Sequence, residues 1–155
     1  MRLRLSLLCC VLAGAVTSRA EDIAVIVAKS LPIDSVTSDE LAKIFRCETT
    51  EAPDHTKLMI FSRERGSPER EVILKNVYHM SDGSYNKFFM QAVFTGQLTA
   101  APRIVPSAVA MKNLAAANPG AVTYVRASLA DGTVKVLKID GVLPGDPKYP
   151  LKTAD

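Results

Sequence analysis

Residues 58–73 read LMIFSRERGSPEREVI, and this stretch predicts a strand, a tight loop and a helix in direct succession. Leu58–Phe61 is a short apolar run of the kind found in buried strands. Ser67 is a favourable N-cap, and Pro68 suits the first position of a helix. Apolar residues then recur along the expected helix at Val72, Ile73, Leu74 and Val77. Ligands of open α/β sheets bind where strands end and helices begin, so the loop between these two elements is a candidate site.

Three other segments predict strands. Ile23–Ala28 is a continuous run rich in β-branched residues, which is typical of a strand buried inside a sheet. Ala121–Val125 is a second apolar run and follows Asn-Pro-Gly, a sequence that stops helices. Val134–Ile139 follows an Asp-Gly turn and alternates between apolar and charged residues, which indicates a half-buried edge strand.

Three further helices are indicated by capping residues and by apolar residues at helical spacing. The first begins with a potential capping box, formed by Thr37 and Glu40. The second has the strongest amphipathic pattern, so its apolar residues are expected in the core. The expected helices, each with its N-cap, are 38–46 after Thr37, 85–95 after Ser84 and 108–117 after Ser107.

Strands that alternate with helices predict an α/β domain. The sheet is expected to be mostly parallel, with helices on both faces and an antiparallel edge. We expect this domain to span residues 21–145. Glycine and proline recur after residue 140, so residues 146–155 are expected to form an irregular tail.

The first twenty residues resemble a cleavable secretory signal. Arg2 and Arg4 lead into the apolar run Leu5–Val16, and small residues follow as far as Ala20. The run is shorter than the roughly 20 apolar residues that span a bilayer, so no membrane span is expected after cleavage. We therefore expect a periplasmic or secreted protein that begins at Glu21.

Removing that segment changes the charge balance. The full chain has 19 Lys plus Arg and 16 Asp plus Glu, and three of the arginines lie in the first twenty residues, which leaves 16 charges of each sign. A formally neutral chain does not favour nucleic-acid binding, which needs a basic surface. Cys47 is then the sole cysteine, so an intramolecular disulfide is excluded. An inert thiol and an intermolecular disulfide both stay open.

The residues around the 62–67 loop form a candidate anion site. A helix N-terminus carries unpaired N–H groups and a partial positive charge, which attract anions. Arg63, Arg65 and Arg70 can each bind a phosphate or carboxylate with two hydrogen bonds, and Ser67 adds a hydroxyl donor. The alternative is an ordinary capped surface helix whose arginines pair with neighbouring glutamates.

Arg63-Glu64-Arg65-Gly66-Ser67 resembles the R-x-x-G-S start of the phosphate-binding loop in the phosphate-type periplasmic solute-binding proteins. These are substrate-binding proteins of ABC transporters with a type 2 periplasmic-binding-protein-like fold. Residues 23–28, 37–45, 94–96, 118–125 and 134–141 resemble further landmarks of this family in the same order. The resemblance implies a single lobe of that fold, with inorganic phosphate or another small oxyanion bound by Arg63, Gly66 and Ser67.

Three residues depart from the family's loop. Arg65 stands where the family has an acidic residue that accepts a proton from the bound phosphate. Pro68 stands where the family has glycine, so a backbone donor is missing, and Glu69 replaces a threonine, so a hydroxyl becomes a negative charge. We therefore expect weak oxyanion binding by one lobe. The alternative is a lobe that has lost its ligand and acts as an interaction module, pairing with a second copy or with another exported protein.

Neither a catalytic nor a metal site is expected. His55 and His79 are the only histidines, and no spacing of His, Cys or acidic residues resembles a zinc site. The sequence offers no set of nucleophile, base and orienting residue. It therefore predicts a binding protein without a cofactor, not an enzyme.

Overall fold

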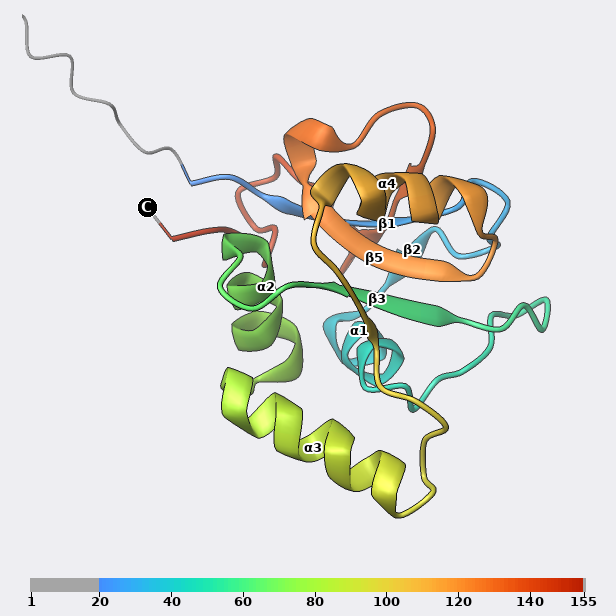
Figure 1. The fold of residues 1–155 in the computed structure, drawn as a ribbon. Coiled ribbons are helices and arrows are strands. Elements are labelled where there is room, and N and C mark those ends of the chain that lie inside the picture. The colour runs from blue at the N-terminus through green and yellow to red at the C-terminus, as the bar shows by residue number, and fades with distance from the viewer. Residues whose placement is uncertain (1–19, 155) are drawn as a thin grey trace, which may run out of the picture.

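The computed structural model describes residues 20–154, so the expected signal lies outside the described residues except for Ala20. A five-stranded sheet forms the centre of the fold, in the order β4-β3-β5-β1-β6. Figure 1 labels three of its strands, β1, β3 and β5. Its strands are β1 (Ile23–Val27), β3 (Met59–Arg63), β4 (Arg103–Val105), β5 (Ala121–Arg126) and β6 (Lys135–Val136). A separate parallel pair is formed by β2 (Ser35–Val36) and β7 (Lys138–Ile139).

The sheet is mostly parallel, as predicted, in that four of its five strands run in the same direction. β3 pairs in parallel with both β4 and β5, while β1 is antiparallel to β5 and to the edge strand β6. β1 thus runs against the other strands of this sheet and lies second from its edge. Every residue of β1 has no exposed surface, which fits its continuous run of apolar side chains.

Helices cover both faces of the sheet, which confirms the predicted α/β class. The helices are α1 (Ser38–Phe45), α2 (Pro68–Ile73), α3 (Asp82–Phe94) and α4 (Ala108–Ala117), and a π-helical segment, Leu74–Tyr78, continues α2. Figure 1 shows α4 on one face of the sheet and the other three helices on the opposite side. The predicted capping box of α1 and the predicted N-caps of α2 and α4 are all present.

The predicted N-cap of α3 is wrong by one turn. The helix begins after Ser81, whose hydroxyl accepts a hydrogen bond from the backbone N–H of Ser84 at 3.1 Å. Both serines are suitable caps, but the earlier one brings Asp82 into the first turn, where a negative charge is favourable. The expected core residues of this helix are Tyr85, Phe88, Phe89, Ala92 and Val93. Tyr85, Phe89 and Ala92 are buried, whereas Phe88 is half-buried and Val93 is 39% exposed.

The predicted strand over 134–139 is divided between two sheets. Its first half, β6, is the edge strand that pairs with β1, and its second half, β7, pairs with β2. Leu137 lies between the two and is fully buried, and its N–H donates to the carbonyl of Val25. The sequence did not predict β4, which has three residues and lies between Pro102 and Pro106.

Residues 149–151 bring the C-terminal end of the described chain onto the core. The Tyr149 hydroxyl donates to the carbonyl of Ile23 at 2.8 Å, and the N–H of Ile23 donates to the carbonyl of Leu151 at 2.8 Å. Both Tyr149 and Leu151 are buried. The first strand is therefore held on one side by this segment, which lacks regular strand or helix structure of its own.

Candidate anion-binding site

The loop between β3 and α2 lies at the carboxyl end of β3, as the sequence indicated. Gly66 has φ of +84°, a left-handed conformation that glycine adopts without strain. This turn brings Ser67 into position as N-cap, where its hydroxyl oxygen accepts from the N–H of Arg70 at 3.4 Å. The same hydroxyl donates to the carbonyl of Glu64 at 3.0 Å, so Ser67 closes the loop on itself.

Arg63 is the last residue of β3. Its side chain is more accessible than those of Ser67 and Arg70, which were also predicted as ligands. Its side chain is 12% exposed and pairs with Glu64 at 2.7 Å and with Glu69 at 3.8 Å. The Nε atom of Arg63 is buried and has no hydrogen-bond partner among the described residues. A buried donor without a partner is costly, and Nε is the one buried donor of this guanidinium that no described residue satisfies.

Arg70 lies behind the loop rather than at its surface. Its side chain is 4% exposed, and it donates to the Ser62 hydroxyl at 2.8 Å, to the Arg63 carbonyl at 3.1 Å and to Asp82 at 2.9 Å. It also lies over the ring of Tyr85, 4.6 Å from the centroid. The hydrogen bond from Arg70 holds the pKa of Asp82 below its ordinary value. With its donors used inside the protein, Arg70 fixes the shape of the loop.

The hydroxyl of Tyr124 fixes the loop from β5. It accepts from the N–H of Arg63 at 3.0 Å and lies 3.0 Å from the hydroxyl of Ser62. Burial raises the pKa of Tyr124 to about 12, so the hydroxyl keeps its proton near neutral pH. The start of the loop is therefore held to β5 by the hydrogen bonds of a neutral hydroxyl group.

Sequence reasoning missed a second arginine at this end of the sheet. Arg126 is the last residue of β5. Because β3 and β5 are parallel, Arg126 lies at the same end of the sheet as Arg63. Its Nε donates to Glu69 at 2.8 Å, and its Nη1 lies 3.3 Å from Glu21. Each arginine directly follows a run of buried strand residues, and this shared position was the available signal for their proximity.

Glu69 supplies the negative charge that these two arginines share. Its side chain is 6% exposed and lies between Arg126 and Arg63. Burial opposes ionisation, but the hydrogen bond from Arg126 and the charge of Arg63 outweigh it, so the pKa of Glu69 lies below its ordinary value. A carboxylate of the protein itself therefore occupies a position between two guanidinium groups, an arrangement that also suits a small oxyanion.

The charges around the loop balance. The four arginines are Arg63, Arg65, Arg70 and Arg126, and the four carboxylates paired with them are Glu21, Glu64, Glu69 and Asp82. The Nη groups of Arg63 pair with Glu64 and Glu69, so a ligand anion at these groups would have to displace one of the two carboxylates. Glu64 is the most exposed of the four, with 40% of its side chain accessible, so it is the easiest to displace.

The other side chains in residues 20–154 that could bind a metal or react as a nucleophile do not cluster. No group of three or more His, Cys, Asp or Glu side chains in this range could hold a metal ion. Cys47 is a free, half-buried thiol, and burial raises its pKa, which lowers its reactivity. His55 is exposed, with one ring nitrogen 3.4 Å from Glu51. In the same range, no helix has the length and apolar character needed to cross a bilayer.

Comparisons with known proteins identify the fold. The chain matches no protein-family model and no curated protein. Among solved structures, it is similar to a phosphate ABC transporter substrate-binding protein from Clostridium perfringens with bound phosphate, with a TM-score of 0.69 and 22% identity over 86% of this chain and 53% of that chain.

Two further structures give the same result. An ABC-type phosphate transport receptor from Vibrio cholerae has a TM-score of 0.68 and 19% identity over 86% of this chain and 54% of that one. PstS from Borrelia burgdorferi has a TM-score of 0.66 and 17% identity over 86% of this chain and 55% of that one. The chain therefore shares the fold of phosphate ABC transporter substrate-binding proteins, and it spans about half of their length.

Proposed function

We propose that this chain is an exported domain that binds phosphate or another small oxyanion weakly, at the loop formed by residues 63–67. The observation that carries the proposal is the state of Arg63: a mostly buried guanidinium with an unpartnered Nε, at the carboxyl end of a strand in a fold shared with phosphate-binding proteins. A buried arginine with spare donors favours a planar or tetrahedral oxyanion over a neutral ligand.

Each predicted site residue has a distinct role in this proposal. Arg63 contacts the anion, which takes the place that Glu64 now holds at 2.7 Å. Gly66 permits the turn, and Ser67 caps α2 and keeps the loop closed. Arg70 acts from behind through its hydrogen bonds to Ser62 and Asp82. Binding is weak because the ligand must compete with carboxylates of the protein.

The N-terminal segment supports export of this domain. A basic start, an apolar run and small residues precede Glu21, which is the order of a secretory signal. We expect protein recovered from outside the cytoplasm to begin at Glu21, as intact-mass measurement would establish. A mature protein that still contains residues 1–20 would contradict this part of the proposal.

Titration calorimetry with phosphate, sulfate and acetate tests the binding site. We expect phosphate or sulfate to bind with Kd on the order of 1 mM, equivalent to about −4 kcal/mol. Arg63→Gln should abolish the heat. Glu64→Gln should tighten binding several-fold, because it removes the competing carboxylate from an exposed position without disturbing the core.

Arg65→Gln is the matched control for these variants. Arg65 carries the same charge in the same loop, but its side chain is 72% exposed and pairs with Asp82 rather than facing Glu64. It should bind phosphate as the wild type does. Absence of heat with all three anions in both the wild type and Glu64→Gln, or unchanged binding by a folded Arg63→Gln variant, would contradict the proposal.

A further inference from the structure

An exposed apolar face lies at the C-terminal half of α3 and the neighbouring β4, on a different part of the molecule from the loop. Its four large side chains are Met90, Val93, Phe94 and Ile104, which are 70%, 39%, 91% and 54% exposed. We call these four residues the α3–β4 face. The largest apolar patch on a typical monomer covers about 300–600 Å² and is often functional, so this face is a candidate interaction surface.

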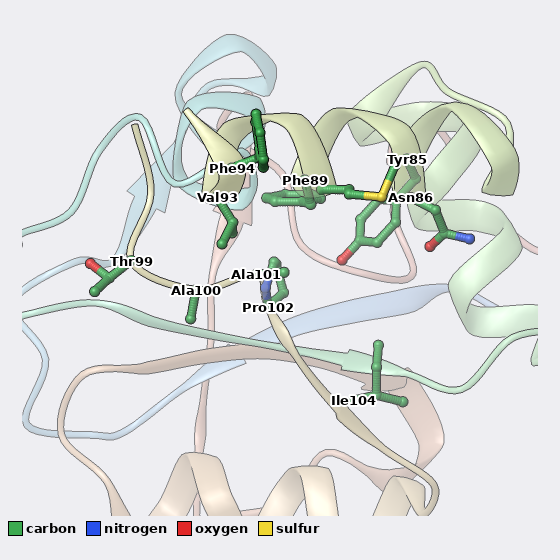
Figure 2. Close-up of a pocket in the computed structure, with 11 residues that line it drawn as sticks. Tyr85, Asn86, Phe89, Val93, Phe94, Thr99, Ala100, Ala101, Pro102 and Ile104 are labelled. Atoms are coloured by element: carbon green, nitrogen blue, oxygen red, sulfur yellow. The ribbon is translucent and has the colours of Figure 1, made fainter. Parts of the chain in front are cut away.

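The α3–β4 face has a projection next to a hollow. A groove of about 690 Å³ runs between α3 and residues 99–104, with Tyr85, Phe89 and Pro102 among its walls. Figure 2 shows Phe94 at the end of α3, at the rim of this groove, with its ring directed away from the groove. The surface thus presents a large apolar side chain and, beside it, a hollow of apolar character.

The face also lacks charge. Residues 88–102 contain no Lys, Arg, Asp or Glu, although 23% of the whole chain is charged. Cores of protein–protein interfaces are depleted of charged residues and rich in aromatic residues and methionine. A nucleic acid would instead need a basic face, so the composition favours a protein partner over a nucleic acid.

The area of the face is that of a weak, transient dimer. Aromatic side chains bury about 150–250 Å² each, and one aromatic and three aliphatic side chains at these exposures present roughly 450 Å² per copy. Two copies in contact would bury about 900 Å² from these side chains, which is below the ~1,200 Å² of stable specific interfaces and within the range of weak, transient ones.

We infer that the α3–β4 face is a docking surface for a second copy of this chain, in a two-fold dimer where Phe94 of each copy enters the groove of the other. A two-fold interface requires a patch that is complementary to itself. A projection and a hollow side by side on one face satisfy that requirement, because the two-fold axis places each opposite its counterpart.

Sedimentation velocity of the purified protein, measured from about 1 to 200 µM, tests the inference. We expect a reversible monomer–dimer equilibrium with no larger species. Phe94→Ser should raise the dimer dissociation constant at least 100-fold, because each dimer loses two buried aromatic side chains. Phe94 is 91% exposed in the single copy, so the substitution leaves the fold of the monomer intact, as circular dichroism would verify.

Leu143→Ser is the matched control, since Leu143 is 44% exposed and lines a different hollow, with Ala24 and Val136. It should dimerise as the wild type does. A wild type that stays monomeric at 200 µM overturns the inference, even if it captures another protein. So does a dimer that survives Phe94→Ser, or a series of larger assemblies, which would indicate an interface that does not close.

Discussion

Replacing Glu69 with glutamine should destabilise the fold and at the same time make room for a ligand anion. Glu69 is a buried carboxylate that bridges Arg126 at 2.8 Å and Arg63 at 3.8 Å. The amide keeps the size of the side chain but removes its charge. Two guanidinium groups then lie close together without the carboxylate that they share, and an oxyanion from solution can take its place.

The size of the effect follows from burial. Removing one partner of a fully buried ion pair costs about 3–5 kcal/mol. Arg126 is 41% exposed, so water compensates part of that loss, and the expected cost is about 2 kcal/mol. For a domain of this length, that lowers Tm by roughly 6–9 °C. Phosphate at ten times its Kd should restore about 1.4 kcal/mol to the variant.

Thermal unfolding with and without phosphate measures both effects. The variant should gain more Tm from phosphate than the wild type, in which Glu69 competes for the same arginines. Glu71→Gln is the control, because Glu71 lies on the same helix but is exposed, and it should change Tm by less than about 2 °C. A Glu69→Gln protein that melts with the wild type, or that gains no more from phosphate than the wild type, would refute the reasoning.

Three further predictions concern stability. The pKa of Asp82 is depressed below 3.8 in the folded protein, so the ionised carboxylate stabilises the fold above about pH 4. This stabilisation is lost as the pH falls through the folded-state pKa. Asp82→Asn should therefore lessen the difference in unfolding free energy between pH 7 and pH 3, measured by urea titration. Gly120→Ala should cost roughly 3 kcal/mol in urea denaturation, because its Cβ would lie 1.9 Å from the Lys57 carbonyl oxygen. Tyr149→Phe removes the hydrogen bond to Ile23 and should cost about 1–2 kcal/mol in thermal melts.

Local signals in the sequence predicted most element boundaries. Thr37, Ser67 and Ser107 were identified as N-caps because a cap bonds to a backbone N–H only three residues away. The same reasoning placed Gly66 and Ser67 in one loop. It predicted Ser84 where the structure has Ser81, since both are good caps; the earlier start brings Asp82, which pairs with Arg70, into the first turn.

The sequence pattern does not predict which distant strands pair, or in which direction. The direction of β1 against β5 depends on the whole topology, and a continuous apolar run is compatible with either direction. The site shows the same limit. The neighbours of Arg63 in sequence identify it as a candidate ligand. Its surroundings also include Glu69, which accepts a hydrogen bond from Arg126, 57 residues beyond Glu69 in the chain. Only the parallel pairing of β3 and β5 brings these charges together.

The position of β1 also has a consequence for when this chain can fold. β1 is paired with β5, with β6 and with residues 149–151, and the hydrogen bond between Tyr149 and Ile23 joins residues 126 positions apart. Pairings this distant form late, after the slow closure of a long loop. In a partly synthesised chain, the partners of β1 are not yet present. Such a delay would suit the export that we propose, in which the chain crosses a membrane unfolded before its sheet closes.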